Sequence, residues 1–335
     1  MTITTDITFN ELLNKPEVTG FRNFLLSNCD IPNMDWSLKA MQEEFYDWVA
    51  DSIAHGLSRL FTLIEDGVKV DYDFYTAEEK RLSPDREGTK LFFFPGKKGM
   101  PFVMICPGGG YTAVCTLKEG FTTAARLNEL GYNAFILSYR VKAAEDKDHS
   151  GITPKALDDM AAAMRFIESH ADLFGVSLNQ YAVSGFSSGG HLAGEWATKN
   201  VGARSYGIAA PTAVFLGYPA SDTTEYHLLN GRNPLLERML GSQYTEADVE
   251  KYNVNAHIDE NYPVTYLWHC KDDDIIPIQT SYNMMEELKK HKIPFVFKEV
   301  EHGGHGFGLG EYGEANGWLE EAIELWESTS LNGKR

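Results

Sequence analysis

Cysteine is scarce in this chain, with four in 335 residues, and no two stand at the spacing of a zinc site or a redox motif. Scattered thiols of this kind are typical of a reducing compartment, which predicts a cytoplasmic protein. The first residues show no basic segment followed by an apolar core, so no signal peptide is indicated. Long apolar runs are also lacking, and none could span a bilayer.

Positive charge is in deficit. The chain has 30 Lys and Arg against 48 Asp and Glu, a formal net charge of −18. Such a balance argues against nucleic acid and against an anionic membrane surface as partners. With 43% hydrophobic and 23% charged residues, the composition is that of an ordinary globular protein, long enough for one large α/β domain or two small ones.

The pattern of apolar residues changes along the chain. Up to about residue 60 they recur at helical spacing, which predicts an N-terminal helical extension packed on a main domain over 61–335. The runs 68–75 and 90–94, split by a turn-rich segment, predict an antiparallel strand pair. From there strands and helices alternate, as in a mostly parallel central sheet with helices on both faces. The strands are expected at 102–106, 134–139, 181–184, 213–217, 264–269 and 295–300, and the helices at 117–130, 154–170 (with Thr153 as N-cap), 278–291 and 318–326.

One long interruption separates two of these strands, at about 218–262. It contains a predicted helix at 234–240 and an acidic stretch at 246–252. A connection of this length is usually functional, so we expect a lid or a wall of a binding cleft. A peripheral excursion is the alternative. No internal repeat or low-complexity segment is present.

The segment Gly185-Phe186-Ser187-Ser188-Gly189 follows a predicted buried strand and precedes a predicted helix. A G-x-S-x-G at such a turn is typical of the nucleophile elbow of serine hydrolases. The glycines accommodate a strained turn that lifts the Ser187 hydroxyl out of the sheet. A plain Gly/Ser loop would explain the bare motif, but not its place between strand and helix.

A glycine triplet, Gly108-Gly109-Gly110, follows the strand at 102–106. Its backbone N–H groups could face a ligand without side chains in the way, as in the H-G-G-G-type oxyanion loop of lipases and esterases, although Pro107 replaces the histidine. Gly109 and Gly110, with the N–H of Ser188, are the candidate donors to a developing oxyanion. An ordinary turn is the alternative.

Two further strand ends deliver candidate triad partners. After the strand at 264–269 come three consecutive aspartates, 272 to 274, any of which could orient a histidine; Asp222 is an outside alternative. After the strand at 295–300 come His302 and His305, one of which would be the general base. A metal site on His302 and His305 lacks a third ligand and a helix to set its geometry, so none is expected.

The order serine, aspartate, histidine is that of α/β-hydrolases. The chain resembles the esterase/lipase branch of this superfamily, including hormone-sensitive-lipase-like enzymes and acetyl-xylan and feruloyl-type esterases. The resemblance runs from about Val68 to the end and rests on 101–111, 131–141, 184–194, 269–277 and 305–308. It implies an α/β-hydrolase fold.

The resemblance also selects among the candidates. The family pattern H-G-x-x-D-x-x-x-P matches residues 269–277 with Asp273 as the acid, and departs from it at Cys270. The family's H-G-F matches 305–307 and selects His305. Tyr139-Arg140 is also similar to the family, and we expect Arg140 to pair with Asp158 or Asp159.

These residues predict a carboxylic ester hydrolase with Ser187, Asp273 and His305 as its triad and no cofactor. A small-molecule ester, with short-chain or sugar-linked acyl groups, is the expected substrate. A prolyl-oligopeptidase-like peptidase and a non-catalytic binding scaffold are the alternatives. Tyr111, Phe186 and Phe307 are weak candidates for a substrate-binding wall. The oligomeric state stays open, a homo-oligomer included.

Overall fold

The computed structural model describes residues 1–142, 150–225, 233–311 and 313–332. Its centre is one eight-stranded sheet in the order β1-β2-β4-β3-β5-β6-β7-β8. The first two pairings, β1–β2 and β2–β4, are antiparallel and the other five are parallel. The strands are β1 (Asp71–Tyr72), β2 (Lys90–Phe94), β3 (Phe102–Cys106), β4 (Asn133–Ser138), β5 (Tyr181–Phe186), β6 (Ala213–Gly217), β7 (Val264–Cys270) and β8 (Phe295–Val300).

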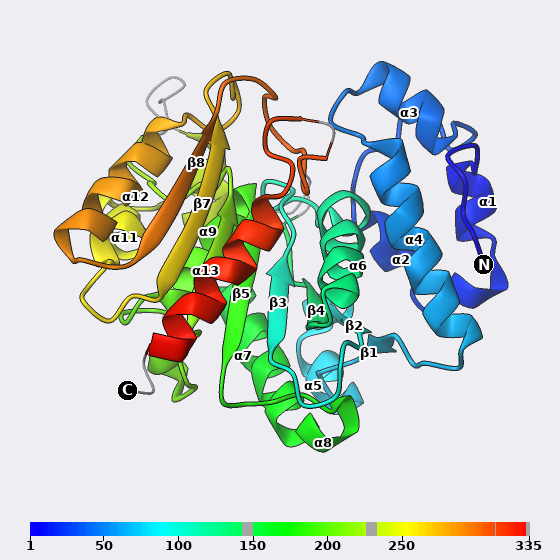
Figure 1. Ribbon diagram of the computed structural model, residues 1–335, viewed down its shortest axis with the longest axis horizontal. Coiled ribbons are helices and arrows are strands. Elements are labelled where there is room, and N and C mark those ends of the chain that lie inside the picture. The colour runs from blue at the N-terminus through cyan, green and yellow to red at the C-terminus, as the bar shows by residue number, and fades with distance from the viewer. Residues whose placement is uncertain (143–149, 226–232, 312, 333–335) are drawn as a thin grey trace.

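Helices cover both faces of this sheet (Figure 1). The α-helices are α1 (Phe9–Leu13), α2 (Arg22–Leu26), α3 (Leu38–Glu44), α4 (Ala50–Glu65), α5 (Ala77–Leu82), α6 (Thr122–Glu129), α7 (Thr153–Ser169), α8 (Ala171–Phe174), α9 (Ser187–Ala197), α10 (Pro234–Leu240), α11 (Glu246–Lys251), α12 (Gln279–Lys290) and α13 (Trp318–Asn332). Short 3₁₀ turns are η1 (Pro16–Val18), η2 (Pro84–Gly88), η4 (Ala203–Tyr206) and η5 (Asn255–His257), and η3 (Thr116–Phe121) is a π-helix.

Alternating side chains of each strand feed two separate hydrophobic cores. Along β2, Phe92 and Phe94 face the core beneath α4, α6 and α13, whereas Leu91 and Phe93 face the core beneath α7, α9 and α12. The central strands are buried throughout, because helices cover them on both sides. The sheet is therefore a rigid frame, and the loops at the carboxyl ends of its parallel strands converge at one edge.

Helices α1 to α4 lie to one side of the sheet in Figure 1, beside α6. Their apolar residues, among them Phe9, Leu57 and Phe61, belong to the same hydrophobic core as Phe92 and Phe94 of β2. Gly56 permits a close approach of α4 to the π-helix η3, because a Cβ there would lie 2.9 Å from the backbone of Phe121. The first 65 residues are thus continuous with the core of the sheet.

Four sequence-based expectations need correction. The strand expected over 68–75 is only two residues long, and it is followed by the unforeseen helix α5, which a capping box of Thr76 and Glu79 starts. The helix expected over 117–130 begins as the π-helix η3 and becomes α-helical only at Thr122. Helix α7 begins one residue early, so Thr153 is its first residue and not its N-cap. Strand β5 runs on to Phe186, directly before the turn.

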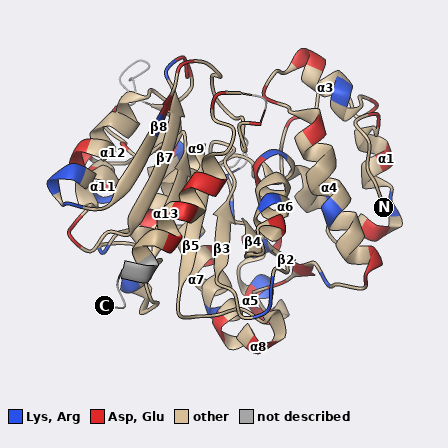
Figure 2. Ribbon diagram, viewed as in Figure 1, with Lys and Arg blue, Asp and Glu red and all other residues tan. Residues whose placement is uncertain are grey.

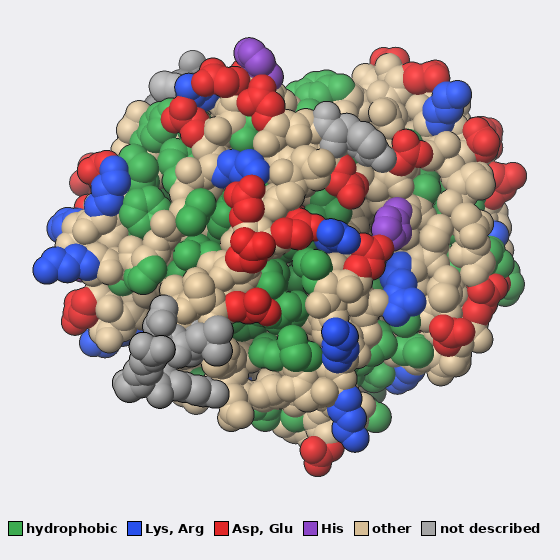
Figure 3. Space-filling view, viewed as in Figure 1, with side chains coloured by type: hydrophobic (Ala, Val, Ile, Leu, Met, Phe, Trp, Pro, Cys, Tyr) green, Lys and Arg blue, Asp and Glu red, His purple; other side chains and the backbone are tan. Residues whose placement is uncertain are grey.

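The surface carries charge of both signs. Acidic residues recur along α13 in Figure 2, and the face shown in Figure 3 mixes acidic, basic and apolar side chains. Within the described ranges, no helix combines the length and the apolarity that crossing a membrane requires.

Candidate active site

Ser187 stands at the turn between β5 and α9, with φ of 53°, a left-handed conformation that non-glycine residues rarely adopt. The two glycines of the motif explain how the turn fits. A Cβ on Gly185 would lie 2.2 Å from the Gly189 carbonyl oxygen, and one on Gly189 would lie 2.1 Å from the Cys106 carbonyl oxygen. The sequence therefore places a strained serine at the carboxyl end of the central strand.

Ser187, His305 and Asp273 form one chain of hydrogen bonds. His305 Nδ1 lies 2.7 Å from Asp273 Oδ2, and its Nε2 lies 2.8 Å from the Ser187 Oγ. A carboxylate can only accept, so the proton of the neutral imidazole is on Nδ1 and Nε2 is free to accept the serine proton. The three residues come from the ends of β5, β7 and β8.

Asp273 is fully enclosed, with 0% of its side chain exposed. Burial by itself would raise the pKa of this carboxyl, but hydrogen bonds from His269 and His305 outweigh it and lower the pKa to about 2. The backbone N–H groups of Ile275 and Ile276 donate to its second oxygen at 2.9 and 2.8 Å. Asp273 is therefore ionised and held in one orientation at neutral pH.

The other candidate acids and the second histidine serve elsewhere. Asp272 accepts the backbone N–H groups of Gly303 and Gly304 and so braces the loop that carries His305. Asp274 is exposed, and Asp222 accepts hydrogen bonds from Thr224, Asn253 and Asn283. The side chain of His302 is 82% exposed and lies 3.5 Å from Asp272. Within the described residues, no three potential ligands cluster as a metal site would need.

The glycine loop, residues 108–110, lies against the turn of Ser187. Its backbone N–H groups differ in whether they already have a hydrogen-bond acceptor. The Gly108 N–H donates to Glu119 Oε2 at 2.5 Å. The N–H groups of Gly109 and Gly110 have no acceptor in the part of the chain that the structure describes. Both residues have positive φ, 129° and 60°. The Ser188 N–H lies in the first turn of α9, where amides lack an intrahelical acceptor. Three free amides thus stand beside Ser187.

Glu119 ties this loop to the loop of His305. It is 2% exposed, and burial raises the pKa of its carboxyl. Its Oε1 accepts from the Tyr218 hydroxyl at 2.8 Å, and that hydroxyl accepts from the Gly308 N–H at 2.8 Å. The Tyr218 ring also lies 4.7 Å from the His305 ring, centroid to centroid. Nothing in the sequence pattern pointed to Glu119 or Tyr218.

A cavity of 340 Å³ opens above Ser187, within the range of small-molecule sites. Besides Ser187, His305 and the glycine loop, its walls include residues that sequence reasoning missed: Asp47, Cys115, Lys118, Glu119, Ala220, Leu235, Arg238, Ile275, Ile276 and Gly306. Asp47 comes from the turn between α3 and α4, and Leu235 and Arg238 come from α10 in the long insertion. Residues 226–232 of that insertion lie outside the described residues.

The three aromatic candidates do not line this cavity. Tyr111 is 0% exposed in the second core and its hydroxyl bonds to His191 Nδ1 at 2.9 Å. Phe186 is also 0% exposed and packs against Tyr218 and Trp318. The Phe307 ring lies 5.6 Å from that of Tyr46. Alternation along the strand turns Phe186 away from Ser187, and the described wall beside the serine is aliphatic and charged instead.

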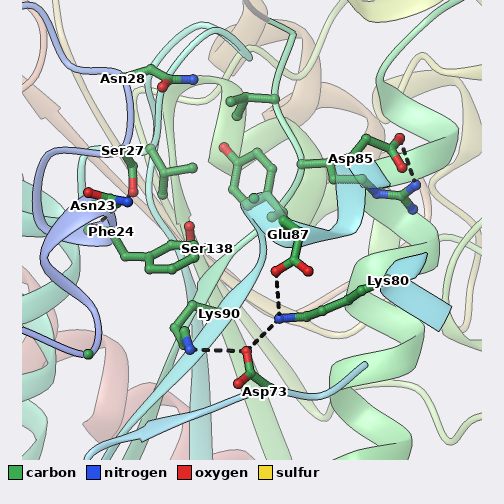
Figure 4. Close-up of a pocket in the computed structure, with 16 residues that line it drawn as sticks. Asn23, Phe24, Ser27, Asn28, Asp73, Lys80, Asp85, Glu87, Lys90 and Ser138 are labelled. Atoms are coloured by element: carbon green, nitrogen blue, oxygen red, sulfur yellow. Dashed lines mark hydrogen bonds and ion pairs between the residues drawn. The ribbon is translucent and has the colours of Figure 1, made fainter. Parts of the chain in front are cut away.

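A second cavity, of 600 Å³, is lined by residues of α2, η2 and the end of β4, among others (Figure 4). Its charges are paired: Lys80 lies between Asp73 and Glu87, and Lys90 also reaches Asp73. Arg140, which lines it as well, was expected to pair with Asp158 or Asp159. It pairs with Asp159, at 2.9 Å, and with Asp85. Asp158 accepts from the Tyr206 hydroxyl instead.

Three features define the α/β-hydrolase fold. They are the sheet order, the strained serine at the end of β5, and the hydrogen bonds that link this serine to a histidine and an aspartate in the loops after β8 and β7. The sequence-based expectation of that fold is confirmed. Residues 93–288 match the family described as BD-FAE, so the chain belongs to this family.

Relatives support the same grouping. An acetylxylan esterase of Xylanibacter ruminicola is 23% identical over 73% of this chain and 49% of its own length. An endo-1,4-beta-xylanase B of Butyrivibrio fibrisolvens is 27% identical over 64% of this chain and 34% of its own. The chain thus spans between a third and a half of these curated relatives. A solved acetyl ester-xyloside bifunctional hydrolase from Caldicellulosiruptor lactoaceticus shares 28% identity with a TM-score of 0.61, over 72% of this chain and 88% of its own.

Proposed function

We propose that the protein is a serine-dependent carboxylic ester hydrolase. The observation that carries this proposal is the hydrogen-bonded chain from Asp273 through His305 to Ser187, at the floor of a cavity lined by free backbone amides. Relatives named as esterases support the same reaction class. No cofactor is part of this proposal.

The proposed reaction is a two-step acyl transfer. His305 Nε2 takes the proton of Ser187 while the serine oxygen attacks the ester carbonyl carbon. The carbonyl oxygen becomes an oxyanion, which accepts hydrogen bonds from the free amides of Gly109, Gly110 and Ser188. His305 then gives its proton to the leaving alcohol, and an acyl-enzyme remains. Water, deprotonated by the same imidazole, hydrolyses it and restores Ser187.

The Gly108 N–H is excluded as an oxyanion donor, because Glu119 already occupies it. Its hydrogen bond instead fixes the loop so that the next two amides stay free. Asp273 remains a carboxylate throughout, holds the imidazole tautomer and stabilises the imidazolium.

For the substrate we propose an ester with a short acyl group on a small alcohol or a sugar. The cavity of 340 Å³ suits a small ester. The names of two relatives, an acetylxylan esterase and an acetyl ester-xyloside hydrolase, favour acetylated sugars among these.

The test is the initial rate of the purified protein on 4-nitrophenyl acetate, butyrate and octanoate, on methyl ferulate and on acetylated xylo-oligosaccharides. The proposal expects turnover that falls with acyl length and a loss of about 10⁴-fold or more in kcat for Ser187→Ala. Turnover retained by Ser187→Ala would refute the assignment of the nucleophile. Cleavage of prolyl peptides without ester hydrolysis would favour a peptidase, and no turnover by a folded protein would favour a binding scaffold.

Four unpaired cysteines among the described residues are compatible with a reducing compartment, and a cytoplasmic location is part of the proposal. Cell fractionation tests it. Light scattering of the purified protein tests whether it forms a homo-oligomer.

A further inference from the structure

We propose that Arg238 forms an anion subsite inside the catalytic cavity, and that the preferred substrates are esters carrying a carboxylate. The inference rests on the proposed ester hydrolysis and adds a preference for anionic substrates to it. Arg238 lies on α10 and lines the same cavity as Ser187 and His305.

The charged groups of this cavity are Asp47, Lys118, Glu119, Arg238 and His305. Lys118 and Asp47 form an ion pair with each other. Glu119 is occupied by the Gly108 N–H and the Tyr218 hydroxyl, and burial raises its pKa. Arg238 alone among the cations lining the cavity has no acid within ion-pair distance in the described chain.

Arg238 uses one of its five N–H donors in a hydrogen bond from Nη1 to the Gly110 carbonyl oxygen at 2.6 Å. The side chain is half-buried, and burial lowers the pKa of its guanidinium. A half-buried cation without a counter-ion is partly desolvated without compensation, so such an arrangement is typical of a site that a ligand completes. The remaining planar donors match the two oxygens of a carboxylate.

The neighbouring cavity provides a contrast within the same molecule. Its three cations, Lys80, Lys90 and Arg140, each lie within 3.4 Å of at least one carboxylate, and Figure 4 shows Lys80 between two of them. That cavity is internally neutral and has no need of an anionic ligand. The chain has 48 acidic residues with which a guanidinium could be paired, and none of the described ones forms an ion pair with Arg238.

A purely structural role would be to hold the Gly110 carbonyl, and thus the glycine loop. That role predicts equal losses for all esters when Arg238 is changed. An anion subsite predicts a loss confined to charged esters. Since the net charge of −18 repels anions at long range, a preference for them must come from a local cation.

The experiment compares isosteric pairs of substrates. 4-Acetoxybenzoate and 4-acetoxybenzamide differ by a charge on the alcohol side, and the 4-nitrophenyl monoesters of adipic acid and of its monoamide differ on the acyl side. The anionic member of one pair is expected to have a kcat/KM about tenfold higher, mainly through KM. Arg238→Gln should abolish this ratio and Arg238→Lys should retain part of it. Arg81→Gln, a charge-matched change on exposed α5, should leave it intact.

Each outcome of this experiment either supports or overturns the anion subsite at Arg238. An unchanged ratio in Arg238→Gln, or equal losses on both members of a pair, overturns the subsite. If Arg238→Gln does not fold, inhibition of the unmodified protein by benzoate against benzamide replaces it, and equal inhibition overturns the proposal. Ser187-dependent turnover of neutral 4-nitrophenyl acetate tests ester hydrolysis separately, so failure of the subsite and failure of the proposed function are distinguishable.

Discussion

Glu119 is expected to control the rate without touching the reacting atoms, and Glu119→Gln is the variant that shows it. The carboxylate accepts two hydrogen bonds, from the Gly108 N–H and the Tyr218 hydroxyl. An amide of the same shape can accept only one of them with its oxygen. If the amide oxygen accepts from Gly108, its NH₂ faces Tyr218, whose oxygen already accepts from Gly308.

The Tyr218 O–H then loses its acceptor inside the protein. An unsatisfied buried donor costs about 1–3 kcal/mol, and the loops of Gly109 and His305 can relieve it only by moving. Losing one oxyanion donor costs about 3 kcal/mol of barrier, so partial misplacement should cost about 1–2 kcal/mol. We therefore expect kcat to fall by about 5- to 30-fold, with a small change in KM.

The assay is kcat on 4-nitrophenyl acetate, with Glu195→Gln as the matched control. Glu195 is likewise buried, both of its oxygens lack a hydrogen-bond partner in the described part of the chain, and burial raises its pKa well above its usual value. It is not in the cavity wall, so its amide variant should keep full activity. In Glu119→Gln, removal of a buried charge stabilises the fold, whereas loss of the Tyr218 hydrogen bond destabilises it. Because these two effects on Tm oppose each other, the decisive measurement is kcat. An unchanged kcat in Glu119→Gln would refute the reasoning.

Two further predictions concern the other acids of the site. Because the pKa of Asp273 is lowered to about 2, it contributes about 2.5 kcal/mol of stability above its unfolded pKa near 4, and this is lost as the pH falls through about 2. Asp273→Asn should therefore flatten the unfolding free energy over that window, as measured by urea titration, and lower kcat by about 10³- to 10⁴-fold at neutral pH. Asp47→Asn leaves the largely buried ammonium of Lys118 without its partner and should destabilise the fold by about 1–3 kcal/mol. The same change at exposed Asp274 should be silent in urea unfolding, and equal effects at both positions would contradict the ion-pair argument.

Features that depend on local sequence were predictable. The candidate nucleophile Ser187 follows from two glycines whose spacing has a steric cause, because a Cβ on either would lie only 2.2 or 2.1 Å from a backbone carbonyl oxygen. The proximity of the candidate acid and histidine to Ser187 follows from where strands end, because parallel strands deliver their carboxyl ends to one edge. Choosing Asp273 over its two neighbours needed the resemblance, since the run of three aspartates has no local feature that tells them apart.

Features that depend on long-range packing were not predictable. Glu119 accepts from a residue 11 positions earlier and from Tyr218, 99 positions later. Phe186 looked like pocket wall because it precedes the serine, but the alternation of β5 turns it into the core beside Trp318. The short helix α5 was missed although its capping box, Thr76 and Glu79, is legible in the sequence.

The N-terminal segment illustrates how such packing makes a site. The turn between α3 and α4 brings Asp47 into the cavity beside Ser187, where it pairs with Lys118, and brings the ring of Tyr46 against Phe307. Both contacts brace the loop that carries His305, whose own strand β8 is the half-exposed edge of the sheet. An edge strand alone holds a loop weakly, so the imidazole owes part of its position to residues more than 250 positions away in sequence. The first 65 residues are therefore a structural part of the site and not an appendage.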